Sequence, residues 1–294
     1  MLVLKRSFLI VSLALALTAL SFAPLLAQDE APTEPAPADT SGMDPVTTPA
    51  PLPTRLPRLP PLFTLTEGNA TLELFFQTLP QGETGLAHVS GPGVAGARAR
   101  FLDEMIEFFP IEDDGFYGLL SADMEAITRR SADLAVFVWY EDGTRSTINT
   151  QVEIVLGGFI TQLVTLAPDK GYLLDIETER NELARLESIF ANVTETRLWD
   201  ETGFQMPILS GLTSPFGAFR TFNGALNTRH TGWDIRTTLG VPVMASAGGR
   251  VVFSGPLEIR GSHVVVDHGY GVFSGYSHLS QVHVTRGQMV TKGQ

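Results

Sequence analysis

Short apolar runs that end at turn residues are the feature that most limits how the first half of the chain can fold. Residues 135–140, Ala-Val-Phe-Val-Trp-Tyr, form a continuous run of β-branched and aromatic character, and Glu-Asp-Gly follows it. Residues 147–156 alternate instead, with Ile148, Val152, Ile154 and Leu156 on one face. Such strands, separated by turn residues, are typical of an all-β sandwich. We therefore predict a β-domain over residues 62–168.

Charge and cysteine content exclude several classes of protein. The chain has 294 residues, enough for about two domains, and its 20 basic and 32 acidic residues give a net charge of −12. Phosphate backbones bind to basic surfaces, so we expect no nucleic-acid partner. The chain contains no cysteine, which removes disulfides, iron–sulfur clusters and thiolate zinc sites. Any metal site must therefore use His, Asp or Glu.

The first 27 residues have the order of an export signal. Lys5 and Arg6 precede an uncharged apolar stretch over residues 8–22, and Ala27 stands before a polar segment. We predict a signal peptide, and hence a secreted or cell-envelope, extracytoplasmic protein. Leu25 is bulky for a cleavage site, so an uncleaved segment with N-terminal membrane association stays open as the alternative. Residues 28–61 hold ten of the 19 prolines and are predicted to be an extended linker rich in Pro, Ala and Thr.

One helix is expected between the two halves of the chain. Leu183, Leu186 and Phe190 recur at helical spacing within residues 174–190, with charged residues around them. We interpret residues 169–200 as a helical connector whose apolar face packs on a neighbouring domain.

Histidines are concentrated in the last third of the chain, where five of the six lie between His230 and His283. His230 and Asp234 are four residues apart, and on a strand an even spacing would put both side chains on one face. Imidazole and carboxylate both bind zinc, and a catalytic zinc takes three protein ligands plus water. Taken alone this spacing occurs by chance, so its meaning depends on the surrounding sequence.

An ordered series of motifs surrounds the pair. It comprises Ser-Pro-Phe-Gly at 214–217, Gly-Val-Pro-Val at 240–243, Val-Val-Val-Asp-His-Gly-Tyr-Gly at 264–271, Tyr-Ser-His-Leu-Ser at 276–280, and Gly287 to Gln294. Over roughly residues 203–294 the series resembles the lysostaphin/LytM-type zinc metallopeptidase family, which cuts peptide cross-links of bacterial cell walls. The resemblance implies antiparallel β-sheets around a groove in a zinc metallopeptidase domain over residues 201–294.

The resemblance also assigns roles to individual residues. His230 and Asp234 match two zinc ligands, and His278 matches a catalytic histidine that is not a ligand. The family's third ligand and a further catalytic histidine belong to a His-x-His motif that does not occur before Gln294. We therefore expect a C-terminally truncated chain that is metal-poor, inactive as it stands, and left with an unpaired sheet edge near the two ligands. His263 and His268 receive no catalytic role, and His88 has no visible partner.

The upstream region resembles exported members of the same family that carry an immunoglobulin-like β-domain before the peptidase; residues 116–120, Trp199 and Phe204 fit this arrangement. The predicted fold is thus mainly β: an immunoglobulin-like sandwich, a helical connector and an antiparallel-β metallopeptidase domain. The predicted function is hydrolysis of peptide cross-links in peptidoglycan, with Zn²⁺ as cofactor. The alternative is a non-catalytic wall-binding regulator with a degenerate peptidase domain; an adhesion protein is less supported.

Overall fold

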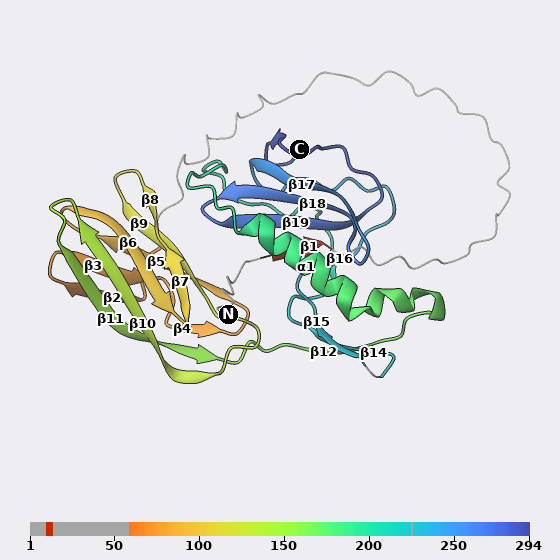
Figure 1. Cartoon of the computed structure of the whole chain (residues 1–294), viewed down its shortest axis with the longest axis horizontal. Helices are drawn as coiled ribbons and strands as arrows, with labels where there is room; N and C mark the ends of the chain where they lie inside the picture. Colours follow the sequence, from red (N-terminus) through yellow and green to blue (C-terminus); the bar gives the residue numbers. More distant parts are fainter. Residues whose placement is uncertain (1–9, 14–58, 225) are drawn as a thin grey trace, which may run out of the picture.

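The computed structural model describes residues 10–13, 59–224 and 226–294. It is mainly β, and its described part contains one α-helix, α1, Ile176–Phe190 (Figure 1). The prediction of a mainly β chain is therefore confirmed. The predicted signal peptide, apart from Ile10–Leu13, and the predicted linker up to residue 58 lie outside the described residues. No helix among the described residues is long and apolar enough to cross a membrane.

Two five-stranded sheets form the N-terminal unit. The first has the order β2-β3-β5-β9-β8, with bounds Phe63–Glu67, Ala70–Leu74, Thr84–Ser90, Gly115–Ser121 and Phe109–Ile111. The second has the order β4-β11-β10-β6-β7, with bounds Thr78–Pro80, Arg145–Val155, Arg129–Tyr140, Val94–Phe101 and Glu104–Glu107. Neighbouring strands are antiparallel, except that β4 runs parallel to β11.

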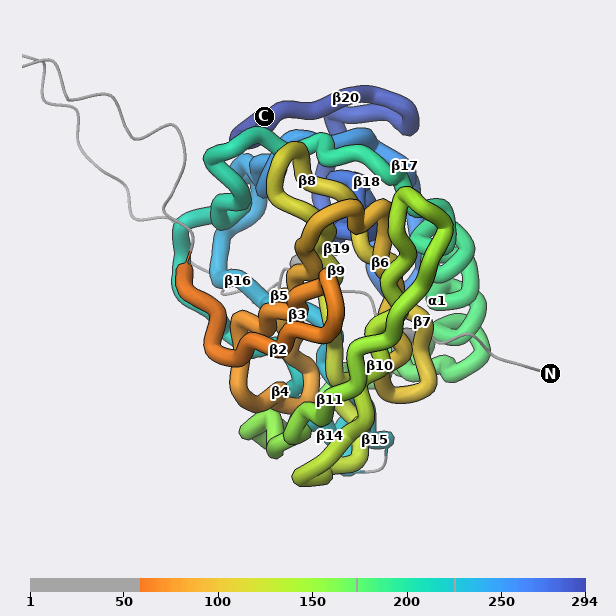
Figure 2. The backbone as a smooth tube through the Cα atoms, turned by 90° about the vertical axis from the view of Figure 1, so that its left-hand side faces the viewer, coloured from red at the N-terminus to blue at the C-terminus, as the bar shows by residue number. Residues whose placement is uncertain are grey.

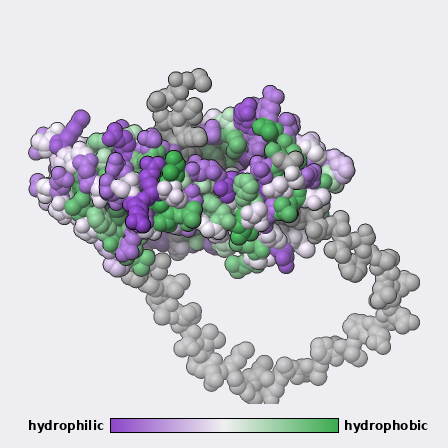
Figure 3. Space-filling view, turned by 90° about the horizontal axis from the view of Figure 1, so that it is seen from below, coloured by the Kyte–Doolittle hydropathy of each residue, from purple (hydrophilic) through white to green (hydrophobic). Residues whose placement is uncertain are grey.

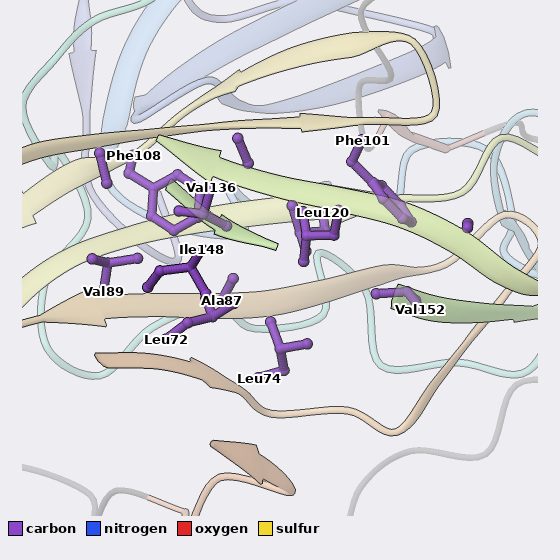
Figure 4. Packing of buried hydrophobic residues seen from close by; sticks show 14 of the residues in the cluster. Leu72, Leu74, Ala87, Val89, Phe101, Phe108, Leu120, Val136, Ile148 and Val152 are labelled. Carbon is purple, nitrogen blue, oxygen red and sulfur yellow. The ribbon is translucent and has the colours of Figure 1, made fainter. Parts of the chain in front are cut away.

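Alternation along the strands builds the core between these sheets. The two runs that predicted strands are β10 and β11, and they place Val136 directly opposite Ile148, both fully buried. The expectation that Leu156 shares this face is wrong, because β11 ends at Val155 and Leu156 is exposed. Leu72, Val89 and Leu120 approach the same core from the other sheet (Figure 4). Burying one such aliphatic side chain contributes about 1.5–3 kcal/mol. The unit therefore has the two-layer form expected of the sequence, while its immunoglobulin-like topology stays a prediction.

A third five-stranded sheet organises the C-terminal unit. Its order is β1-β19-β18-β17-β20, with bounds Ile10–Leu13, Val272–Leu279, Gly261–Gly269, Gly249–Leu257 and Met289–Val290. Two small sheets accompany it: β12-β14-β15, with bounds Thr161–Val164, Phe219–Phe222 and Leu226–Arg229, and β13-β16, with bounds Leu212–Ser214 and Asp234–Ile235. β12 falls within the range predicted for the first domain, yet it pairs in parallel with β14.

Helix α1 covers one face of the β17-β18-β19 layer. A 3₁₀ helix, Pro168–Leu174, leads into it, and Asp175 caps its N-terminus by accepting a 3.0 Å hydrogen bond from Thr178 N–H. Leu186 and Phe190 of α1 pack against the sheet. The opposite face of the sheet packs against a second cluster that includes Ile235. The sheet is thus covered on both faces, which explains why β18 is buried without alternation from His263 to Gly269.

The outer edge of β19 is paired. β1 runs parallel to it, from Ile10 opposite Phe273 to Leu13 opposite Tyr276, and β1 also contacts β16. A segment from the far end of the sequence thus occupies the edge of β19. Among the described strands, β16 pairs only with β13 and β15 only with β14, so the expectation of an unpaired edge near His230 and Asp234 stays a prediction.

The two units touch at several points. Tyr270, in the turn after β18, stacks on Phe109 with ring centroids 4.9 Å apart and donates a 2.9 Å hydrogen bond to the Pro110 carbonyl. On another side, Arg229 Nε lies 2.6 Å from Glu125 Oε1. In Figure 2, viewed from the side of the N-terminal unit, the helix and the β17-β18-β19 sheet lie behind that unit. Hydrophobic and hydrophilic side chains are interspersed over the face shown in Figure 3.

Candidate metal and catalytic site

The structure brings His230 and Asp234 together, but not along one strand. His230 follows the end of β15, Asp234 opens β16, and the chain bends between them at residues 231–233. The His230 Nε2 and Asp234 Oδ1 atoms are 3.0 Å apart, and both residues are buried. The two residues are therefore neighbours, as their even spacing predicted, but for a different reason. A bend in the chain, and not the alternation of side chains along one strand, turns them toward each other.

A backbone carbonyl fixes the orientation of the His230 ring. His230 Nδ1 lies 2.8 Å from the Pro215 carbonyl oxygen, which can only accept, so Nδ1 carries the proton. Nε2 then presents a lone pair toward Asp234, as in a metal-ligating histidine oriented by its second nitrogen. The Pro215 carbonyl belongs to a tight loop ending at Gly217, whose φ is +75° and where a Cβ would lie 2.2 Å from the Phe159 ring. Only glycine fits there.

Asp234 has one engaged and one orphaned oxygen. Its Oδ2 accepts a hydrogen bond from Arg220 Nη2. Its Oδ1 is buried and makes no hydrogen bond, although His230 Nε2 lies 3.0 Å away. Burial raises the pKa of Asp234, but the imidazolium that His230 forms when protonated and the Arg220 guanidinium more than offset this effect, and the net pKa lies below its ordinary 3.8. The carboxylate is therefore ionised at neutral pH.

These two residues fit part of a zinc site. Two lone-pair atoms face each other at 3.0 Å, close to the ~3.3 Å that separates neighbouring ligands of a tetrahedral zinc with bonds of ~2.0–2.1 Å. A buried oxygen without a hydrogen bond is the kind of group that a cation satisfies. Within the described ranges, however, no group of three or more His, Asp or Glu residues is placed to hold a metal. The described residues thus supply two ligands.

His278 occupies a β-bulge. Ser277 and His278 of β19 together lie opposite the single residue His263 of β18, and His278 has φ +56°. Bulges of this kind re-aim a side chain beside active sites. His278 is exposed and is not bonded to the pair; its link to Asp234 is electrostatic. Desolvation lowers its pKa below 6.5 and Arg260 adds to this, against the carboxylates of Asp234 and Glu182, which raise it.

The other buried histidines are held by the protein. His268 uses both ring nitrogens, 2.7 Å from the Gly248 carbonyl and 2.8 Å from Ser274 Oγ. His263 Nδ1 lies 3.0 Å from Ser277 Oγ, and burial lowers its pKa to about 4, so its ring is neutral. The expectation that His88 has no partner is wrong: its Nδ1 lies 2.7 Å from Glu73, and its Nε2 contacts the Asp114 carbonyl.

Two further residues of the site were not predicted. Arg220 binds Asp234, and Gln162 of β12 accepts hydrogen bonds from Arg220 Nε at 3.3 Å and from Ser214 Oγ at 2.7 Å. Arg220 was visible only as a basic residue close behind the 214–217 motif. Gln162 gave no signal, because it is 52 residues away from Ser214 and its contact depends on the parallel pairing of β12 with β14.

Comparisons with known proteins identify relatives of the C-terminal region. Residues 228–294 match the family model "Peptidase family M23". The peptidoglycan DD-endopeptidase ShyA of Vibrio cholerae is 38% identical over 65 residues, 22% of this chain and 15% of the relative. The lipoprotein NlpD/LppB homolog of Pseudomonas aeruginosa is 41% identical over 73 residues, 24% of each chain. The matches therefore span less than a quarter of the length of these relatives.

A solved structure extends the likeness in fold. A Pseudomonas aeruginosa protein described as a peptidase M23 superposes with a TM-score of 0.51 at 22% identity, covering 72% of this chain and 79% of that one. At this identity the match concerns the fold alone. The family match assigns residues 228–294, and only those residues, to a domain of peptidase family M23.

Proposed function

We propose that this chain is an extracytoplasmic zinc metalloendopeptidase that hydrolyses peptide cross-links of bacterial peptidoglycan. The proposal rests on the M23 match and on one observation: the lone pair of His230 Nε2 faces the buried, unbonded Oδ1 of Asp234 at 3.0 Å. The relative ShyA is named a peptidoglycan DD-endopeptidase, which supports cross-linking peptides as the substrate class.

In this proposal each residue of the candidate site has a defined role. His230 and Asp234 would hold zinc, which when bound lowers the pKa of its water toward ~7 and polarises the scissile carbonyl. Arg220 and the Pro215 carbonyl orient the two ligands. The lowered pKa of His278 keeps its exposed ring neutral at neutral pH, so the ring can accept a proton and then hydrogen-bond a developing oxyanion.

The test measures the zinc content of the purified full-length protein and its cleavage of purified peptidoglycan. H230A and D234A are compared with H283A, which removes an exposed histidine that is not a proposed ligand. We expect both ligand variants to lose zinc and cleavage, because removing one ligand of a three-ligand site leaves a weak two-ligand one. H283A should retain both. Near-normal zinc in both ligand variants would refute the assignment.

The alternative is a non-catalytic wall-binding regulator. The observation in its favour is that the described residues supply only two suitably placed metal-binding groups. The same experiment separates the two functions. Peptidoglycan binding without bound zinc or cleavage in the wild-type protein would identify the regulator, whereas cleavage that stops on chelation identifies the enzyme.

A further inference from the structure

A buried carboxylate on α1 binds the loop that lies behind His278. Glu182 is 6% exposed, although it is an ionised residue type on a helix surface. Its Oε1 accepts a 2.8 Å hydrogen bond from Ile259 N–H, and its Oε2 accepts one of 2.8 Å from Arg260 Nη1. Ile259 and Arg260 lie in the three-residue loop between β17 and β18. One side chain of α1 therefore holds both the backbone and the side chain of this loop.

The same loop holds the backbone of His278. The Arg260 carbonyl accepts a 2.8 Å hydrogen bond from His278 N–H. Next to it, Gly261 lies beside His278: a Cβ there would be in ordinary van der Waals contact, 3.4 Å from His278 Cα and 3.5 Å from His278 Nδ1. A non-glycine residue with φ +56° is held only when its surroundings determine its conformation. The loop contributes to that constraint through the hydrogen bond between the Arg260 carbonyl and His278 N–H.

We propose that Glu182 is a positioning residue for His278: by anchoring the β17–β18 loop from α1, it keeps the bulge at His278 in the geometry that directs its imidazole. The role in turnover rests on the proposed function, whereas the effect on His278 geometry does not. α1 is then more than a connector: Glu182 on its inner face binds Arg260, and the Arg260 backbone binds the candidate catalytic histidine.

Glu182→Gln is the decisive change, because Gln cannot accept both hydrogen bonds or balance the Arg260 charge. Glu187→Gln is the matched control, since Glu187 is exposed on the same helix and undergoes the same chemical change. Amide hydrogen exchange at His278 is compared with that at Val265 and Val266 of β18, which are buried in the sheet. We expect about tenfold faster exchange at His278 alone in E182Q, because the loop opens locally. E187Q should match wild type.

Turnover gives the second readout. In E182Q we expect kcat to fall by roughly ten- to a hundredfold, because the catalytic imidazole is misplaced. KM should change little, since substrate binding does not depend on that imidazole. If E182Q does not fold, E182Q/R260Q leaves no unpaired buried charge and should show the same faster exchange at His278. Unchanged exchange at His278, or faster exchange spread equally over β18 and β19, would overturn the proposal. Faster exchange at His278 in a protein whose wild type cleaves no peptidoglycan would support the positioning role and refute the proposed function.

Discussion

At the scale of single residues, the site contains polar groups whose roles are separable. His230 and Asp234 face each other, whereas His278 stands apart in its bulge. We predict that H278A retains zinc but loses turnover by about 10²–10⁴-fold, the usual contribution of a positioned acid–base group. Metal analysis and peptidoglycan cleavage on the same preparation test this. Loss of zinc together with activity would make His278 a ligand or a structural support.

His263 gives a prediction on pH. Its folded-state pKa is about 4, below the ordinary 6.5, so protons bind preferentially to the unfolded chain. Stability is therefore complete above pH 6.5 and falls as the pH drops toward 4. Between pH 7 and pH 5 we expect a loss of about 2 kcal/mol from this group, at 1.36 kcal/mol per pH unit. Urea unfolding at both pH values should show a smaller decline for H263N than for wild type; equal declines would contradict the prediction.

At the scale of elements, α1 shows what a sequence pattern reveals and what it hides. Helical spacing predicted the helix, and Asp175 provides its N-cap. Glu182, Leu186 and Phe190 are four residues apart and all buried, so Glu182 lies on the apolar stripe. A charged residue at such a position indicates a buried partner, and this signal was available in the sequence. The identity of the partner was not, because Arg260 lies 78 residues further along the chain.

The packing of α1 on its sheet leads to a stability prediction. Leu186 is 2% exposed and packs in the cluster with Phe253, Val265 and Phe273. L186A should lower the free energy of unfolding by about 2–5 kcal/mol, because it removes buried methyl groups and leaves a cavity. E187A, on the exposed side, should change stability by less than about 0.5 kcal/mol. Denaturant titration measures both, and equal effects would show that α1 does not pack as described.

At the scale of the whole molecule, the sequence predicted the two β-rich halves but not how they join. Alternating runs such as residues 147–156 identify strands because burial on one face imposes a period of two. The junction between the two units was not predicted, because the sequence of Thr161–Val164 does not indicate that this strand pairs with β14. The bend at residues 231–233 was equally hidden, because it depends on the pairing of β16 with β13.

The contact between the units can be tested at Tyr270. Y270A removes the stacking on Phe109 and the hydrogen bond to the Pro110 carbonyl. An aromatic pair contributes about 0.5–1.5 kcal/mol beyond the area it buries, so the units should separate more often. Small-angle X-ray scattering should then show a larger radius of gyration than for wild type. Y172A, which removes an exposed tyrosine, is the control. An unchanged radius in Y270A would show that the other contacts suffice.

The parallel pairing of β12 with β14 also determines how tension would pass through the molecule. β12 connects the N-terminal unit to α1, and its four residues pair with four residues of β14. A pull on the N-terminal unit would slide β12 along β14, so the hydrogen bonds between them would bear the load together, in shear. Gln162 lies in this strand and holds Arg220, the partner of Asp234. Mechanical load on this strand pair would therefore reach the groups that orient the candidate zinc ligands.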